Sequence, residues 1–154
     1  MLEIYNSTKK AIPEQLLEKA VLFVFEQEGY RVESVVCVYC GNKMIQRINR
    51  EFLGHDYPTD TITFRYNRGS EVDGEFYISL DMVRENALKF GVDFQQELLR
   101  VTFHSALHLI GIDDQTPEER TLMQEKEAFY LGLISAETSA YEQLTCEKTE
   151  DQNP

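Results

Sequence analysis

The sequence predicts an α+β (α/β) domain in which helices pack on a single mixed sheet of about four strands. Segments that alternate apolar and polar residues, as half-buried strands do, are interspersed with segments whose apolar residues recur every three or four positions, as in amphipathic helices. Two of the strand segments are joined by a short, turn-rich connection, which favours an antiparallel pair. A chain of 154 residues with 42% hydrophobic content suits one domain. We place that domain at 1–134 and expect residues 135–154 to form an acidic, flexible tail.

The first half of the chain alternates strands with helices. Residues 2–6 predict a short strand because apolar and polar positions alternate. A helix is expected from Pro13 to Glu28, since proline suits the first helical position, an apolar stripe repeats at helical spacing, and a glycine follows. Residues 32–40 are β-branched and apolar and predict a buried strand. A second helix is expected at 43–52, with Asn42 as its N-cap.

The second half begins with two strands and ends with helices. The strands are expected at 61–66 and 75–80, and their connection favours a hairpin. The three helices are expected at 81–90, 94–110 and 117–131. Asp81 and Asp93 can cap the first two, while the third opens on a threonine cap, a proline and a glutamate.

The charge of the chain limits its partners. Fifteen basic residues against 27 acidic ones give a formal net charge of -12, which argues against broad electrostatic attraction to nucleic acid or to an anionic membrane. The beginning of the chain is polar, and the longest apolar run, 20–25, is too short to cross a bilayer. We therefore expect a cytoplasmic protein with no membrane partner.

Cys37 and Cys40 form a CxxC pair. Such a pair can be a redox couple or half of a zinc site. Here it lies in a predicted strand, where the two side chains point to opposite faces, and the sequence offers no second pair to complete a zinc tetrad. We therefore favour two buried cysteines that take no part in the chemistry.

Two of the three histidines, His104 and His108, lie four residues apart in a predicted helix. That spacing places both imidazoles on one face, within reach of a single metal ion. Gly111 can end the helix, so that the chain folds back and brings Asp113 or Asp114 towards the same point. Two histidines and one carboxylate describe an open metal site at the end of a central helix. The alternative is a pair of ordinary core or surface histidines.

Ser105 distinguishes this helix from the metal-binding helix of zinc peptidases. The peptidase motif places a glutamate, which acts as the general base, directly after the first histidine. Serine at that position supplies no such proton acceptor, so peptidase activity is disfavoured.

The chain resembles the YbeY family of bacterial metal-dependent endoribonucleases and rRNA maturation factors. The family signature, His-Gly-x-Leu-His-Leu-x-Gly-Tyr-Asp-His, corresponds to 104–114, where the first two histidines, the Leu-His-Leu core and the glycine match. Two further blocks, 49–64 and 74–79, agree with the family in order and spacing. The resemblance covers about 15–130, and three ordered blocks are more specific than a single pair of histidines.

Three positions depart from the family pattern. The third histidine ligand of the family is replaced by Asp114, an arginine expected to contact phosphate by Leu53, and a glycine by Ser105. A carboxylate is a competent ligand, but its charge makes the ion a weaker Lewis acid than three imidazoles would. Arg50 and Arg65 are our candidates to supply the missing positive charge.

The resemblance implies an endoribonuclease that cleaves single-stranded RNA in rRNA processing and ribosome maturation. His104, His108 and Asp114 would hold one divalent metal ion, with Zn preferred and Fe, Mn, Co or Ni compatible with the same donors. His55 lies in the connector that the resemblance places near the metal. It is either a solvent-exposed histidine or a fourth ligand, a proton-transfer group or a substrate contact.

The expected partners are single-stranded RNA, including rRNA, together with a ribosomal subunit or ribosome-associated proteins. A second hypothesis keeps these partners but gives the metal a structural role. The protein would then be a ribosome-associated RNA-processing factor with little nuclease activity.

Overall fold

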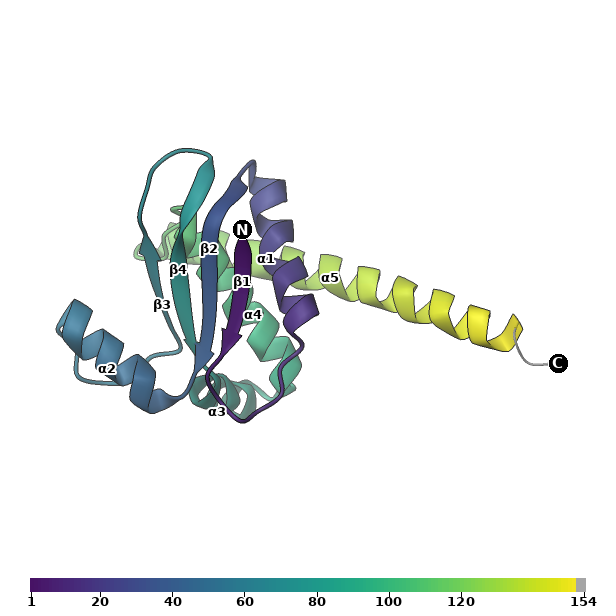
Figure 1. The fold of residues 1–154 in the computed structure, drawn as a ribbon, viewed down its shortest axis with the longest axis horizontal. Coiled ribbons are helices and arrows are strands. Elements are labelled where there is room, and N and C mark those ends of the chain that lie inside the picture. The colour runs from purple at the N-terminus through teal and green to yellow at the C-terminus, as the bar shows by residue number, and fades with distance from the viewer. Residues whose placement is uncertain (152–154) are drawn as a thin grey trace.

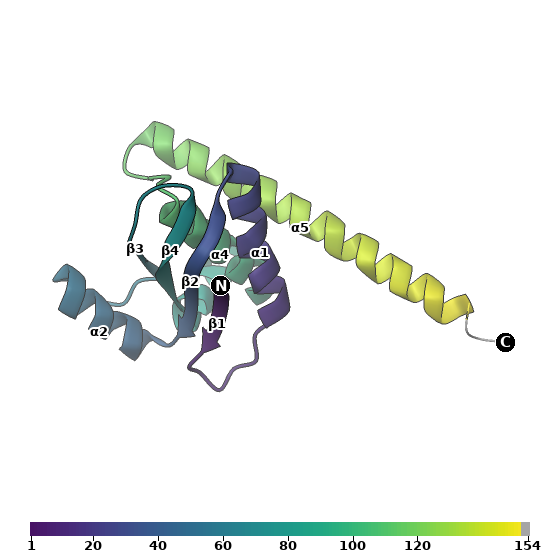
Figure 2. The same ribbon diagram turned by 45° about the horizontal axis from the view of Figure 1, so that its top comes forward.

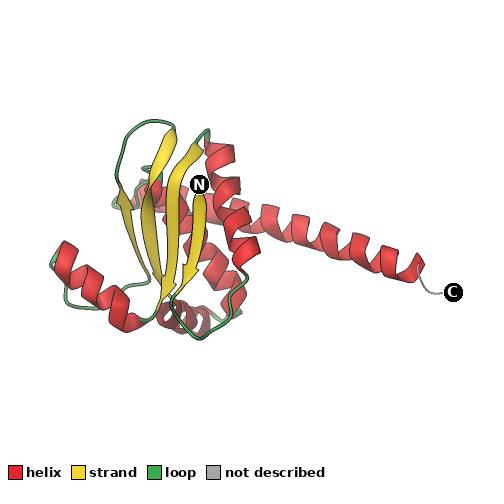
Figure 3. Cartoon of the chain, viewed as in Figure 1, coloured by secondary structure: helices red, strands yellow, loops and turns green. Residues whose placement is uncertain are grey.

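The computed structural model describes the backbone of residues 1–151 and the side-chain surroundings of residues 1–137 (Figure 1). The strands are β1 (Leu2–Asn6), β2 (Arg31–Cys40), β3 (Thr61–Arg65) and β4 (Glu71–Ser79). The helices are α1 (Glu14–Glu28), α2 (Asn42–Leu53), α3 (Leu80–Phe90), α4 (Phe94–Leu109) and α5 (Pro117–Asp151). The predicted order of strands and helices is confirmed, although β4 begins earlier than expected (Figure 3).

The strands form one mixed sheet in the order β1-β2-β4-β3. β1 pairs with β2 and β2 with β4 in parallel, while β3 and β4 form the predicted antiparallel hairpin. The two parallel pairs are joined by longer crossovers that contain α1 in one case and α2 with β3 in the other. The predicted α+β fold with a four-stranded mixed sheet is therefore confirmed.

The main core lies between the sheet and the helices α1 and α4. α4 contacts α1, α3, α5, β3 and β4, and even its polar side chains Glu97, Thr102 and Ser105 are buried. The hydroxyl groups of Thr102 and Tyr39 lie 2.9 Å apart and join α4 to β2. α4 is thus the central helix, enclosed on several sides rather than on one apolar face.

The opposite face of the sheet carries a smaller apolar cluster beneath α2, formed by Cys40, Ile45, Ile48 and Ile62. Cys37 belongs instead to the main core, so the two cysteines point to opposite faces as predicted. Burial raises the pKa of the Cys40 thiol to about 11 and that of Cys37 further still. Protonated, buried thiols are poor nucleophiles and metal ligands, which supports the interpretation of Cys37 and Cys40 as core residues.

Two helix caps differ from the prediction because the paired ends of β2 and β4 bring the beginnings of α2 and α3 together. Gly41, not Asn42, is the N-cap of α2, and Ser79, not Asp81, caps α3 by accepting a hydrogen bond from the N–H of Met82. Asn42 and Asp81 interact across the two helices instead. The Asp81 carboxylate accepts the Asn42 N–H at 2.8 Å, and the Asn42 side chain accepts the Ser79 hydroxyl at 2.7 Å.

α5 begins at the predicted threonine cap, since the N–H of Glu119 donates to the Thr116 hydroxyl at 3.1 Å. It continues to Asp151, beyond the predicted end at Leu131, and its later part projects away from the sheet (Figure 2). The sequence after Gly132 has no proline before Pro154 to stop it. We expected residues 135–154 to form a flexible tail. Most side chains of this segment lie outside the described residues, so its flexibility stays a prediction. Within the described chain, each helix is too short or too polar to span a bilayer.

Gly74 lies in β4 where a side chain would have no room between β3 and Leu109 of α4. A Cβ atom at this position would lie 2.5 Å from the carbonyl oxygen of Phe64 and 2.9 Å from a methyl carbon of Leu109. We expect Gly74→Ala to lower the free energy of unfolding by roughly 1–3 kcal/mol, because backbone and a core side chain must both shift. Urea denaturation measures the change.

Gly132→Ala is the matched control for this substitution. Gly132 lies in α5 with no atom within 4 Å of the added Cβ, so alanine there should stabilise the helix by about 0.5–1 kcal/mol. Equal shifts of the same sign in the two variants would contradict the described packing around Gly74.

Candidate metal centre

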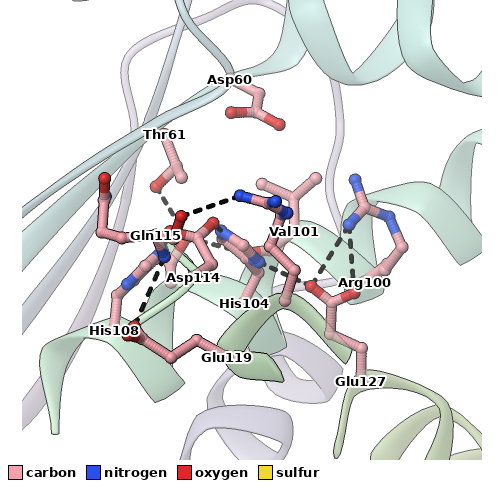
Figure 4. Close-up of polar contacts among 12 residues, drawn as sticks. Asp60, Thr61, Arg100, Val101, His104, His108, Asp114, Gln115, Glu119 and Glu127 are labelled. Carbon is pink, nitrogen blue, oxygen red and sulfur yellow. Dashed lines mark hydrogen bonds and ion pairs between the residues drawn. The ribbon is translucent and has the colours of Figure 1, made fainter. Parts of the chain in front are cut away.

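Three donor groups converge where α4 ends and the chain turns back (Figure 4). Nε2 of His104 lies 3.5 Å from one carboxylate oxygen of Asp114, and Nε2 of His108 lies 3.5 Å from the other. One donor atom from each of the three residues lies within 4.8 Å of the others. The two imidazole rings meet edge to face, with centroids 4.5 Å apart. The structure thus brings together the three residues that the sequence predicted as ligands.

The turn after α4 explains why Asp114 joins the cluster. Gly111 adopts the left-handed conformation at φ 95°, and its N–H donates to the carbonyl of His108 at 3.0 Å. The N–H of Ile112 donates to the carbonyl of Leu107, also at 3.0 Å. This glycine turn ends the helix as predicted. It reverses the chain and places Asp114, rather than the exposed Asp113, beside the histidines.

The donor set fits a divalent metal ion. Zinc binds imidazole nitrogen and carboxylate oxygen at about 2.0–2.2 Å, so two donors on a tetrahedral ion lie roughly 3.3 Å apart. Each histidine lies 3.5 Å from a different oxygen of Asp114, which is close to that value, and one donor atom from each of the three residues lies within 4.8 Å of the others. Three protein donors leave a coordination position for water or substrate, which is the pattern of catalytic rather than structural sites. The same donors also suit Fe, Mn, Co and Ni.

A buried charge network supports His104 from behind. Nδ1 of His104 lies 2.6 Å from a carboxylate oxygen of Glu127, which is only 5% exposed. Arg100 donates to both oxygens of Glu127 at 3.3 Å and to both oxygens of Glu97 at 2.7–2.8 Å. The hydrogen bond to Glu97, together with the charges of Glu127 and Glu97, raises the pKa of Arg100 above its usual range despite burial. The guanidinium group therefore stays charged between its two carboxylates.

This network selects the tautomer of His104. A carboxylate is an acceptor, so the Glu127 contact keeps the proton on Nδ1 and leaves the lone pair of Nε2 facing the donor cluster. The same contact fixes the orientation of the ring and increases its strength as a ligand. Glu127 is thus a positioning residue for the metal site.

The sequence prediction missed Glu127, which lies 23 residues after His104 on a different helix. One signal was present. Glu127 shares the buried stripe of α5 with Met123, Tyr130 and Ile134, and a glutamate is seldom buried unless it is paired. A carboxylate inside an apolar stripe therefore indicates a charged partner elsewhere in the fold.

Ser105, which stands where the family has glycine, ties β3 to α4 beside the metal cluster. Its hydroxyl donates to the carbonyl of Val101 at 2.7 Å, so the Thr61 hydroxyl, also at 2.7 Å, is the donor to Ser105. The first residue of β3 is thereby held against the helix that carries both histidines.

The three donor residues line a cavity of about 400 Å³. Its walls come from the end of α2, the connector 54–60, β3 and the metal cluster. His55 lines this cavity as expected, but it lies outside the three-residue donor cluster, and its Nδ1 is 2.9 Å from the Tyr57 hydroxyl. Among the described residues that form the walls, none is lysine or arginine.

The structure does not bring Arg50 and Arg65 into the lining of this cavity. Arg50 is exposed on α2 and pairs with Asp56 at 3.6 Å. Arg65 donates three hydrogen bonds, to the Leu109 carbonyl, the Gly69 carbonyl and the side chain of Asn67, at 2.8–3.0 Å. Because Arg65 is occupied in holding the end of α4, a structural role accounts for all of its contacts.

Glu127→Gln should lower the affinity for metal by about 10- to 100-fold, because the neutral amide supports His104 less strongly and leaves Arg100 less well compensated. Competition with a chromophoric chelator measures the affinity. Glu125→Gln, an exposed position on the same helix, is the control and should bind metal like the wild type. Wild-type affinity in both variants would show that Glu127 does not support the site.

The fold and the site together place the chain in the class of proteins with a candidate open metal centre, formed by two histidines and one carboxylate at the end of the central helix. The chain belongs to the YbeY family of endoribonucleases, since the profile of the family described as Endoribonuclease YbeY matches residues 3–135. The family predicted from the sequence motifs is confirmed, and the match extends beyond 15–130 at both ends.

Named relatives agree with this assignment. Endoribonuclease YbeY of Chlorobium phaeobacteroides is 65% identical over 130 residues, which cover 84% of this chain and 92% of that protein. The protein of the same name from Chlorobaculum parvum is 60% identical over 133 residues, covering 86% and 94%. A solution structure of a Thermotoga maritima protein is similar with a TM-score of 0.66 and 30% identity, and the similarity covers 92% of this chain and 93% of that one.

Proposed function

We propose that this protein is a metal-dependent endoribonuclease that cleaves single-stranded RNA in the cytoplasm, in rRNA processing and ribosome maturation. The observation that supports this most strongly is the cluster of His104, His108 and Asp114 at a cavity, in a chain of an endoribonuclease family. Zn is the ion we propose first, with Fe, Mn, Co or Ni as alternatives to be separated by metal analysis.

The residues around the centre divide the work of catalysis. When bound, a divalent ion supplies Lewis acidity and lowers the pKa of a water molecule. His104 and His108 present neutral nitrogen donors, and Glu127 keeps the proton of His104 on the ring atom that faces away from the cluster. Asp114 adds one negative charge, which would offset part of the charge of a bound ion. Of the three threonines in the cavity wall, Thr61 is engaged with Ser105, and Thr59 and Thr63 offer hydroxyl groups to phosphate or ribose oxygens.

The electrostatics of the cavity restrict how RNA binds. Neutralisation of phosphates by lysine and arginine usually supplies most of the affinity for nucleic acid. The described lining lacks both residues, and the chain carries a net charge of -12. We therefore propose that base contacts, or presentation of the RNA by a ribosomal subunit or a ribosome-associated protein, provide much of the binding.

The second candidate is a ribosome-associated factor with a structural metal and little nuclease activity. Leu53 in the cavity wall, where the family pattern has arginine, favours it, because a cation that would stabilise the transition state is missing from that position.

Chelation separates the two candidates. The metal-loaded protein is incubated with a labelled single-stranded RNA oligonucleotide before and after chelation, and melting is followed by circular dichroism. The nuclease hypothesis predicts that cleavage stops on chelation while the helical signal at 25 °C is unchanged. No cleavage by the loaded protein, with a large fall in melting temperature on chelation, would instead support the structural role.

A further inference from the structure

We infer that His55 and Tyr57 form a platform on which an unpaired RNA base stacks beside the metal centre. This inference rests on the proposed ribonuclease function and identifies the part of the site that selects single strands. The two side chains line the same cavity as His104, His108 and Asp114.

The two rings are stacked on each other, so the stack can offer an outer face to a base. Their centroids are 5.4 Å apart and their planes differ by 21°, and the Tyr57 hydroxyl lies 2.9 Å from Nδ1 of His55. Tyr57 is nevertheless 54% exposed, so much of the aromatic surface faces solvent. Tyr5 on β1 is equally exposed, at 53%, but it lies away from the lining of the cavity. Exposure combined with a position beside the metal ligands distinguishes Tyr57.

The backbone that carries the platform is held by a buried side chain. Asn49 is 2% exposed, and its Nδ2 donates to the carbonyl of Tyr57 at 2.8 Å. The backbone carbonyl of Asn49 accepts the N–H of His55 at 3.1 Å, and Gly54 between them adopts the left-handed conformation at φ 72° that ends α2. Both platform residues are therefore anchored to α2. Because the loop is already held in place, binding of a base there costs little conformational entropy of the loop.

The composition of the cavity favours base contacts over phosphate contacts. Leu53, beside the platform, is 48% exposed where a phosphate-binding cation was expected, and Asp60 and Asp114 contribute negative charge. Aromatic rings, in contrast, offer a stacking surface that accepts any base without positive charge. In a duplex each base is already stacked and paired, so only unpaired RNA can use the platform.

The test compares full-length variants in binding a fluorescein-labelled 12-nucleotide single-stranded RNA, measured by anisotropy in the presence of a chelator. Tyr57→Ala is expected to weaken binding roughly 5- to 100-fold, the usual effect of losing one stacked base. Tyr57→Phe keeps the ring and should retain most of the affinity. Tyr5→Ala is the matched control and should bind like the wild type. His55→Phe should likewise bind better than His55→Ala, because the platform requires a ring rather than a proton donor.

Two measurements on the wild type test the same idea without a substitution. Removal of the base at one position of the RNA, scanned along the oligonucleotide, should weaken binding strongly at one site. The logarithm of the affinity should fall with the logarithm of salt concentration with a slope of about 1 or less in magnitude, since each phosphate neutralised on a single strand contributes about 0.7. A steep slope and no sensitive position would overturn the platform.

Cleavage of the same RNA by the metal-loaded proteins separates this inference from the proposed function. Binding that depends on Tyr57, without cleavage by the wild type, contradicts the nuclease function and supports the platform. Cleavage and binding that are equal in wild type, Tyr57→Ala and Tyr5→Ala contradict the platform and support the nuclease function.

Discussion

His108→Ala is expected to lower the rate of single-stranded RNA cleavage by about 10³-fold or more. The substitution removes one of three donors, and the Lewis acidity that a bound ion supplies is worth several kcal/mol of barrier, at about 1.4 kcal/mol for each factor of ten. His108 lies at the edge of the core and is partly exposed, so the fold should survive its loss. The comparison uses initial cleavage rates at equal total metal.

Binding provides the control for this variant. In the presence of a chelator, His108→Ala should bind single-stranded RNA like the wild type, because the stacking platform at His55 and Tyr57 does not use the metal. Circular dichroism confirms that both proteins are folded. Equal cleavage rates for the two proteins would eliminate a catalytic role of the metal centre.

Replacement of Asp114 by alanine and by histidine should change the affinity for metal in opposite directions. Asp114→Ala removes the only carboxylate of the cluster and should reduce metal affinity by about 100-fold or more, a larger effect than that of the supporting residue Glu127. Asp114→His restores the ligand of the family pattern and should bind the metal at least as tightly as the wild type. Its cleavage rate should also rise, since a neutral donor leaves the ion a stronger Lewis acid.

The metal content per chain after dialysis shows which of these variants binds metal more tightly. Asp113→Ala, which alters the exposed neighbouring aspartate, should retain metal like the wild type. If the alanine and histidine variants at position 114 both contain wild-type amounts of metal, Asp114 is not a ligand.

The fold was predictable from local patterns because each segment buries one regular face. Alternation at 61–66 and 75–80 predicted the hairpin, and apolar spacing together with helix caps predicted the helices, although α5 continues beyond its predicted end. The centre was predictable for a similar reason. His104, His108 and Asp114 lie within eleven residues of sequence, so helix geometry and one glycine turn determine their separation.

Contacts between distant segments could not be predicted in the same way. Glu127 reaches His104 only because α5 crosses α4, and the crossing of two helices leaves no local signature. Asn42 and Asp81 do not cap α2 and α3 as predicted. They interact with each other instead, because the ends of β2 and β4 are adjacent in the sheet. Arg65 was a reasonable candidate for phosphate contact by charge alone, yet its guanidinium group donates a hydrogen bond to the carbonyl of Leu109 at the end of α4.

The most direct test of the central claim is a titration of metal-free wild-type protein with Zn, and separately with Fe, Mn, Co and Ni. Bound metal and the rate of single-stranded RNA cleavage are measured on the same samples. We predict that the rate rises in proportion to bound metal and reaches its maximum at one ion per chain for at least one of these metals. Cleavage by the metal-free protein, or saturation at one ion per chain with no cleavage for any of them, would contradict the account.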